Sequence, residues 1–370
     1  MNRRNLIPTL LLTATALTGA VRAQETLRRG ASNEQLIDDE LRQAVARGHE
    51  WLASHQHRDG YWAELVGYKL NTSYEALDER PLPHVGVTSL ALMSFLAGGH
   101  LPDRGKYGKV ISNGLDFVLR SSQDDGQIMS NGTRMYSHAF ATLFLAEVYG
   151  MVERDDVKRV LQRSVDLIVD SQNAEGGWRY GPQAQDSDMS IVVCQCLALR
   201  AARNIGIRVP KSTIDSAVLY VVDSAVKGQT FRRYNSPGTF TYQRDANSRT
   251  TFPLTAAGVT ALNGLGIYSD ELIDRGIEYL NDTFERFNYS YGRSGHYFFW
   301  YGHYYGVQAM YTKGGIDWVN YFERLRGFLL STQRADGSWP NQIGPGTAFS
   351  TAMGCLILEI PYDFLPIFHR

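Results

Sequence analysis

A short turn pattern, Gln-x3-Gly-x-Trp, occurs three times in this 370-residue chain and constrains its fold more than any other feature. The full copies are Gln56–Trp62, Gln172–Trp178 and Gln333–Trp339, and Gln123–Gly126 is a shortened copy. Each copy follows an amphipathic run and precedes a second, apolar run. A turn that recurs between helix-like segments indicates a fold built from stacked repeats.

The hydrophobic periodicity predicts about six pairs of helices from residue 41 onward. The first helix of each pair is amphipathic and carries charge, so we expect it to face water. The second helix is apolar or small on nearly all sides, so we expect it to be buried between its neighbours. The expected pairs are 41–54 with 85–97, 110–119 with 136–149, 157–169 with 189–202, 214–226 with 251–265, 272–284 with 298–311, and 319–330 with 347–360.

An array of helix pairs can run open as a solenoid or close into a ring. An open solenoid needs polar repeats at its ends, whereas the last repeat here is among the most apolar and ends in the segment 360–368. The pattern therefore favours a closed ring. In each turn, Gly frees the chain to reverse, the Gln amide can bond backbone groups left open at helix ends, and Trp can cover the amide and seal the seam.

The repeated turn is the pattern called the QW motif, and the chain resembles the superfamily of squalene and terpene cyclases and of the beta subunits of protein prenyltransferases. The resemblance covers residues 41–365 and implies an all-α (α/α)6 toroid of about six helix-pair repeats. The motif is specific for the superfamily and not for an activity. Complement-type thioester domains share the toroid, but their Gly-Cys-Gly-Glu-Gln signature is absent from this chain.

The N-terminal segment reads as a targeting sequence. Arg3 and Arg4 precede an apolar stretch over 6–21, and Val21-Arg22-Ala23 fits signal-peptidase cleavage. We expect a signal peptide over 1–23, a linker over 24–40, the toroid over 41–370, and an exported protein, periplasmic or extracellular. An uncleaved anchor is the alternative. No later segment predicts an integral membrane span.

The net charge bears on possible partners, and the cysteine positions bear on possible disulfides. The net charge of −1 provides no basic surplus for nucleic acid, so we expect no nucleic-acid partner. Cys194 and Cys196 lie two residues apart on one predicted helix and cannot bridge, and with Cys355 they read as small buried hydrophobes. No protein partner can be named from the sequence.

The best site hypothesis places chemistry where the second helices begin. In a toroid these helices run parallel, so their N-terminal ends meet at one mouth of the ring. Asp186, Asp188, His138 and His303 lie at such starts, and we predict them as catalytic candidates. For Asp188 the alternative is an N-cap of the helix that follows. For the two histidines it is a satisfied core position or a polar lining of the mouth.

The resemblance supplies two expectations for this region. Cyclases that protonate an alkene or epoxide carry Asp-x-Asp-Asp, but here the fourth position is Met189, which departs from the pattern. Prenyltransferases hold zinc through Asp, Cys and His, and Asp188, Cys194 or Cys196, and His303 could provide these ligands. Ser190 occupies the place of the cysteine in Asp-x-Cys, so we predict no metal and no cofactor.

A run of aromatic residues, 297–305, is the other unusual stretch. Tyr297, Tyr301, Tyr304 and Tyr305 share one helical face, and we predict them as ligand-binding residues of an aromatic wall. Such a wall suits an isoprenoid or a carbocation, and it equally suits sugar rings. Packing between helices is the alternative. In the long loop before residue 251, basic side chains could meet an anion at the mouth or lie solvated: Arg232, Arg233, Arg244 and Arg249.

Three functional hypotheses follow. The first is an exported protein, similar to terpene cyclases and prenyltransferases, that binds an isoprenoid or other apolar small molecule in a central cavity, with or without cyclase- or isomerase-type catalysis. The second is a toroid scaffold without catalysis that presents loops to another protein. The third is a carbohydrate-active toroid in which Tyr and His at the mouth serve as acid and base.

Overall fold

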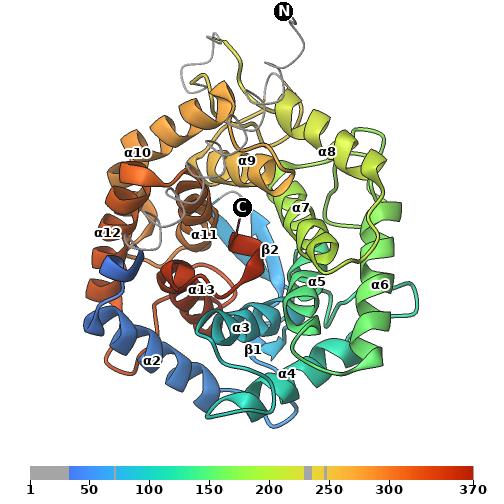
Figure 1. Ribbon diagram of the computed structural model, residues 1–370, viewed down its shortest axis with the longest axis vertical. Coiled ribbons are helices and arrows are strands. Elements are labelled where there is room, and N and C mark those ends of the chain that lie inside the picture. The colour runs from blue at the N-terminus through green and yellow to red at the C-terminus, as the bar shows by residue number, and fades with distance from the viewer. Residues whose placement is uncertain (1–32, 71, 229–235, 246–247, 370) are drawn as a thin grey trace, which may run out of the picture.

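The computed structural model describes residues 33–70, 72–228, 236–245 and 248–369 as two concentric rings of helices (Figure 1). Each outer helix is followed along the chain by an inner one. The outer helices are α2 (Asp39–Ser54), α4 (Gly108–Arg120), α6 (Asp155–Asp170), α8 (Lys211–Asp223), α10 (Glu271–Tyr291) and α12 (Gly315–Thr332). The inner helices are α3 (Val85–Ala97), α5 (Met135–Tyr149), α7 (Met189–Asn204), α9 (Phe252–Gly264), α11 (Tyr297–Lys313) and α13 (Thr347–Glu359).

The predicted all-α (α/α)6 toroid is thus confirmed, and the ring closes. The last inner helix, α13, packs on both α2 and α3, and α12 also contacts α2. The inner and outer helices differ in burial as predicted. Every residue of α3 is buried, whereas α6 buries only one face. An inner helix has neighbours on all sides, so only an apolar or small-residue sequence can occupy that position.

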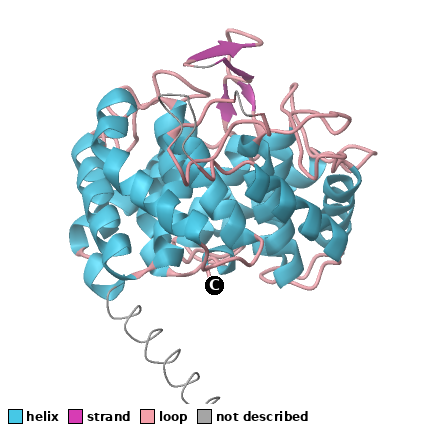
Figure 2. Ribbon diagram, turned by 90° about the horizontal axis from the view of Figure 1, so that it is seen from above, coloured by secondary structure: helices cyan, strands magenta, loops and turns pink. Residues whose placement is uncertain are grey.

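Short strands lie between α2 and α3, where the sequence predicts a polar loop. The strands β2 (Gly67–Leu70) and β3 (Ser73–Ala76) form an antiparallel hairpin, and β1 (Ala63–Glu64) pairs with β4 (Leu82–Pro83). The hairpin stands at one end of the ring, and the C-terminus lies at the opposite end (Figure 2). The hairpin tip is fastened to the start of α11, where His296 Nε2 lies 3.0 Å from the Thr72 carbonyl oxygen.

The glutamine of each full turn ties one repeat to the next. Gln56 Nε2 donates to the Gly60 carbonyl of its own turn at 3.0 Å and to a carbonyl of the next outer helix, that of Val110 in α4, at 2.9 Å. The other two copies repeat this geometry: Gln172 bonds Gly176 and Thr213, and Gln333 bonds Gly337 and Ala44. The last of these bonds joins the end of the ring to its beginning.

Tryptophan, and not glutamine, bonds a carbonyl in the last turn of the preceding helix. The indole N–H of Trp62 donates to the carbonyl of Leu52 in the last turn of α2 at 2.9 Å. Trp178 and Trp339 make the equivalent bonds to Ile168 and Leu329. Each carbonyl lies in the last turn of its helix, where Leu52 and Leu329 also accept from the amides of His55 and Gln333, and Ile168 from the Ser171 hydroxyl. The sequence-based assignment of this role to the Gln amide is therefore wrong, although the Trp rings do seal the seam because all three are fully buried.

The glycine of the turn is required by both conformation and space. Gly337 has φ +93°, and a Cβ at this position would lie 2.4 Å from the Arg47 carbonyl oxygen of α2. Gly60 and Gly176 meet the next outer helix in the same way. The turn therefore approaches its neighbour so closely that only glycine fits.

The predicted signal peptide over 1–23 and the first part of the predicted linker lie outside the described residues. The described part of that linker packs against the ring. Asn33 accepts from the Trp318 indole at 3.1 Å and donates to the Tyr311 hydroxyl at 3.2 Å, and Leu36 is buried. The helix α2 begins at Asp39, two residues before the predicted start of the toroid. Among the described helices, none is both long and apolar enough to cross a membrane.

We predict that Gln333→Ala destabilises the protein by about 1–3 kcal/mol, because two carbonyls at the ring closure lose their donor. Urea unfolding measures the change in the free energy of unfolding. The control is Gln162→Ala, which removes an amide that donates to Asp166 of the same helix and bridges no repeats. A loss no larger than that of the control would show that the Gln bridge does not hold the ring closed.

Candidate functional site

The inner helices begin at the mouth of the ring that the hairpin covers, and two adjoining cavities lie there. Their volumes are about 330 and 280 Å³, and they share the residues Lys69, Leu70, Tyr136, Tyr180 and Tyr301. All six inner helices contribute lining from their first two turns, for example Val87, Tyr136, Ser190, Pro253, Tyr297 and Phe349. The parallel course of these helices brings together residues that are far apart in the sequence.

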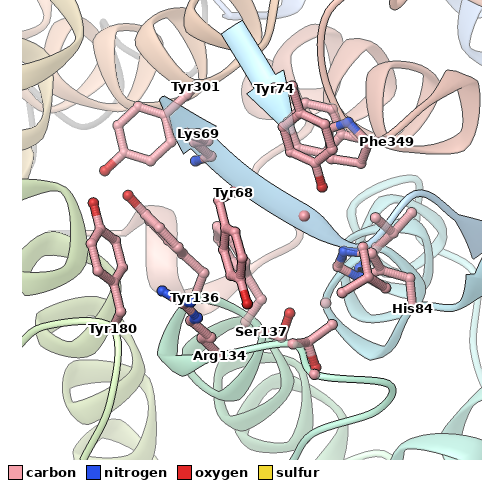
Figure 3. A pocket seen from close by; sticks show the side chains of 18 of the residues that line it. Tyr68, Lys69, Tyr74, His84, Arg134, Tyr136, Ser137, Tyr180, Tyr301 and Phe349 are labelled. Carbon is pink, nitrogen blue, oxygen red and sulfur yellow. Dashed lines mark hydrogen bonds between the residues drawn. The ribbon is translucent and has the colours of Figure 1, made fainter. Parts of the chain in front are cut away.

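Lys69, on hairpin strand β2, occupies the boundary between the two cavities. Its Nζ lies 4.0 Å from the ring centre of Tyr136, 4.9 Å from that of Tyr301 and 5.5 Å from that of Tyr297. Figure 3 shows the amine between Tyr301 and Tyr136. Ring faces attract a cation, so the tyrosines hold the ammonium group. Burial lowers the pKa of Lys69 to about 8, and the charges of Cys194 and Asp188 counteract part of this fall.

The preceding strand residue, Tyr68, points to the opposite face of the hairpin, as alternation along a strand requires. Its ring stacks on Arg134, whose guanidinium carbon lies 3.8 Å from the ring centre. Tyr180 flanks the same guanidinium at 5.7 Å. Arg134 and Tyr68 both line the larger cavity (Figure 3).

A chain of hydrogen bonds leads from the cavity wall to a buried acid. The hydroxyl groups of Tyr136 and Ser190 are 2.5 Å apart, and Ser190 donates to Asp188 Oδ1 at 2.5 Å. Because the serine proton is directed to Asp188, Tyr136 donates to the serine oxygen. Tyr301 donates to the Ser190 carbonyl at 2.7 Å and fixes the same turn. The arrangement can move a proton from a cavity-lining phenol toward Asp188.

Asp188 also caps α7, which is the alternative considered for it from the sequence. Its Oδ1 accepts from the Ile191 amide at 3.1 Å, and the side chain is fully buried. Burial raises the pKa of Asp188, while the bonds from Ser190 and Ile191 oppose that rise. Asp186 lies nearby but is half exposed, and it pairs with Arg179 and accepts from Gln243.

His138 has a structural task in this geometry. Its Nδ1 accepts from the Ile128 amide at 3.0 Å, and its Nε2 lies 3.1 Å from the Ser164 carbonyl oxygen of α6. Thr88 and Thr351 accept from the backbone amides of Trp62 and Trp339 in the same way. His138 therefore anchors the shortened turn to its inner helix, between the two rings of helices, and it lines neither cavity.

His303 lies between α11 and the outer helices. Its Nδ1 is 2.8 Å from the Tyr321 hydroxyl, and its Nε2 is 2.6 Å from Asn288 Oδ1. Phe284 and Phe299 pack on the ring. Burial lowers the pKa of His303 to about 3, so the imidazole is neutral near pH 7. Like His138, it reaches neither cavity, and its predicted catalytic role gains no support from the geometry.

The four tyrosines predicted to bind a ligand lie at two depths in the ring. Tyr297 and Tyr301 line the cavities, whereas Tyr304 and Tyr305 lie deeper in the ring. The ring of Tyr304 stands edge-on to Phe140, which lines the larger cavity, and the Tyr305 hydroxyl lies 3.1 Å from the Cys194 sulfur. The aromatic face thus looks inward as expected, but its second half fills the centre of the ring.

Among the cavity residues that were not singled out from the sequence are Lys69, Arg134 and His84. Lys69 lies in a segment that reads as a polar loop, and Arg134 reads as an ordinary charge before a helix. His84 precedes α3, and its Nδ1 accepts from the Val87 amide at 3.2 Å, so its proton is on Nε2. Burial lowers the pKa of His84 to about 4. The one sequence signal for His84 was its position directly before an apolar run, which marks it as a residue that could cap a helix.

The remaining sequence-based expectations concern arginines and metals. Arg249 lines the smaller cavity, while Arg244 pairs with Asp223, and Arg232 and Arg233 lie outside the described residues. The three cysteines are free and buried. Across the described ranges, no group of three or more His, Cys, Asp or Glu side chains is arranged to hold a metal ion.

Solved structures with a similar fold were found, although no protein-family model and no curated protein matches the chain. An α-1,6-mannanase of Salegentibacter sp. HEL1_6, in complex with α-1,6-mannotriose, has TM-score 0.57 and 10% identity over 86% of this chain and 97% of its own. An unsaturated glucuronyl hydrolase specific for heparin has TM-score 0.54 and 12% identity over 87% and 96%. The cellobiose 2-epimerase of Bacillus thermoamylovorans B4167 has TM-score 0.57 and 12% identity over 84% and 95%.

At this level of identity the similarity establishes the toroid and nothing finer. The predicted ring is confirmed, but the expected membership in the squalene cyclase and prenyltransferase superfamily finds no support among these structures, whose names are those of carbohydrate enzymes.

We predict that acid destabilises the protein in part through His303. Its pKa is about 3 when folded and about 6.5 when unfolded, so the unfolded state binds more protons between these values. The stabilisation that comes from the neutral state of His303 is therefore fully present above about pH 6.5. It falls as the pH drops toward 3, by up to about 1.4 kcal/mol of unfolding free energy per pH unit for one such group.

Thermal unfolding of the protein and of His303→Gln at pH 7 and pH 4.5 tests this. Gln retains polar atoms for Tyr321 and Asn288 but does not titrate. We expect the variant to be less stable at pH 7 and to lose less stability on acidification. An equal loss in both proteins would contradict the neutral, buried state of His303.

Proposed function

We propose that this protein is a carbohydrate-active toroid that binds a saccharide in the two cavities at the mouth of the ring. The observation that carries the proposal is the cavity lining itself. Flat aromatic rings stand beside hydrogen-bonding groups: Tyr68, Tyr136, Tyr180 and Tyr301 with His84, Arg134 and Ser137. Sugars have apolar ring faces and hydroxyl edges, so they bind where aromatic faces and polar groups alternate.

The size and position of the cavities support the same proposal. Volumes of about 330 and 280 Å³ suit one or two sugar units each, and the cavities adjoin at Lys69 and Tyr301. The similar solved structures carry the names of a mannanase, a glucuronyl hydrolase and an epimerase. An apolar isoprenoid chain has no group that could pair with the cations Lys69 and Arg134, which line this space.

The chemistry that the lining favours is proton transfer. Hydrolysis of a glycosidic bond commonly uses two carboxylates that flank the bond, but Glu75, on the exposed strand β3, is the one acidic residue among the described residues that line the cavities. Tyr136 can instead take a proton from the sugar while its own proton passes through Ser190 to Asp188. The reverse path returns a proton to the sugar. His84 offers an Nε2 proton to a sugar oxygen. These groups fit isomerisation or epimerisation of a sugar.

We predict that Asp188→Asn lowers turnover at least tenfold while the fold is retained. Asn can still cap α7, but it cannot take up the proton that Ser190 passes on. Turnover is measured by NMR after incubation with mannose, mannobiose, cellobiose and oligouronides, since NMR separates isomers, epimers and hydrolysis products. The matched control is Asp215→Asn on the outer surface of α8, where the carboxylate pairs with Lys211.

The outcomes separate the functional hypotheses. Unchanged turnover in Asp188→Asn would remove the relay from the mechanism. Failure of every saccharide to bind by calorimetry or on a glycan array, together with an isoprenoid recovered by native mass spectrometry, would overturn the proposal in favour of the apolar-ligand hypothesis. Binding of neither class would favour the scaffold.

A further inference from the structure

The side chains that line the two cavities carry more positive than negative charge. Four are basic and one is acidic: Lys69, Arg134, Arg179, Arg249 and Glu75. Arg179 lines the smaller cavity and is paired with Asp186, and Lys69 and Arg134 are the cations that line the larger cavity. Glu75 is exposed on the hairpin. A neutral sugar does not need this excess of positive charge.

Lys69 and Arg134 are held by aromatic rings. Lys69 lies among Tyr136, Tyr297 and Tyr301, and Arg134 stacks on Tyr68. The carboxyl whose charge acts on Lys69 is that of Asp188, and its Oδ1 already accepts from Ser190 and Ile191. Ring faces stabilise a cation but do not neutralise it. Both side chains therefore keep donor hydrogens for a ligand.

The start of α5 adds to the positive potential. Four of the other inner helices have a side-chain cap from their N-cap residue, and Glu64 fills this role for α13 by accepting from the Ala348 amide. The four capping residues are His84, Asp188, Thr251 and His296. On α5 the N-cap residue is Arg134 itself, and its side chain makes no cap bond. The positive end of the α5 dipole thus meets the cavity beside a guanidinium.

We propose that the saccharide taken by this site is anionic, with its uronic acid carboxylate or sulfate ester between Lys69, Arg134 and the N-terminus of α5. This inference rests on the proposed saccharide function and adds the class of substrate. Guanidinium and ammonium groups form strong, charge-assisted hydrogen bonds with carboxylates and sulfates, and a helix N-terminus favours the same charge. Tyr136 and Tyr180 then lie where the sugar rings can stack.

The affinity also depends on pH in a predictable direction. Lys69 carries its charge below about pH 8 and loses it as the pH rises through that value. The groups that face it are Tyr136 from α5, Tyr297 and Tyr301 from α11, and Asp188 and Cys194 from α7. Burial raises the pKa of the three tyrosines above the ordinary phenol value and that of Cys194 to about 12, so these four stay neutral between pH 7 and 9.

Calorimetry with matched ligands tests the inference on the full chain. We expect tetragalacturonate, or a sulfated carrageenan tetrasaccharide, to bind at least tenfold more tightly than the neutral methyl ester of tetragalacturonate. The two anionic ligands distinguish carboxylate from sulfate. Lys69→Met and Arg134→Met should each weaken binding of the anionic ligands at least tenfold and weaken binding of the neutral ester by a clearly smaller factor. Lys211→Met, an exposed change on α8, is the control and should change neither.

The pH series separates charge from packing. In the unaltered protein, binding of the anionic ligand should weaken between pH 7 and pH 9.5, and Lys69→Met should lose most of this dependence. Equal affinity for the acid and its methyl ester would overturn the anionic inference and leave the saccharide function intact. Failure of all these saccharides, charged and neutral, would overturn the saccharide function itself.

Discussion

The contact between each Gln-x3-Gly-x-Trp turn and the next outer helix is the constraint on which the structure depends. One glutamine amide bonds its own turn and a carbonyl of the neighbouring repeat, while the glycine beside it allows the two backbones to meet. The tryptophan then satisfies the end of the preceding helix. The third copy makes these contacts across the junction between α12 and α2, so the same local chemistry that stacks repeats also closes the ring.

Closure determines where function can arise. Because every inner helix enters the ring in the same direction, six N-termini converge under the hairpin, and each needs an acceptor or an anion. Most are satisfied by side chains from the protein itself, including the Glu64 carboxyl at α13, whose pKa burial raises to about 7. The start of α5 has no side-chain cap, although the Met135 amide donates to the Tyr180 carbonyl. An anionic ligand beside Arg134 and Lys69 can supply the missing negative charge there.

The interior of the ring shows why aromatic content alone does not identify a ligand. Tyr304 and Tyr305 fill the centre and Tyr301 faces a cavity, yet all three belong to one helical face. What separates them is depth, since the hairpin leaves space only above the first two turns of the inner helices. Histidine positions divide in the same way: His138 and His303 fasten layers of helices together, while His84 reaches the cavity.

The sequence alone determined the ring, because the repeated turn and the change from amphipathic to apolar helices leave few other ways to bury the second helix of each pair. It also placed Asp188 and Tyr301 at the mouth, through the shared direction of the inner helices. Only the tertiary structure decided which side chains meet there. Lys69 and Arg134 lie on a hairpin and at a helix start with no periodic signal, and they come together because the hairpin folds over the mouth. Periodicity reports burial within one element, whereas a site depends on contacts between elements.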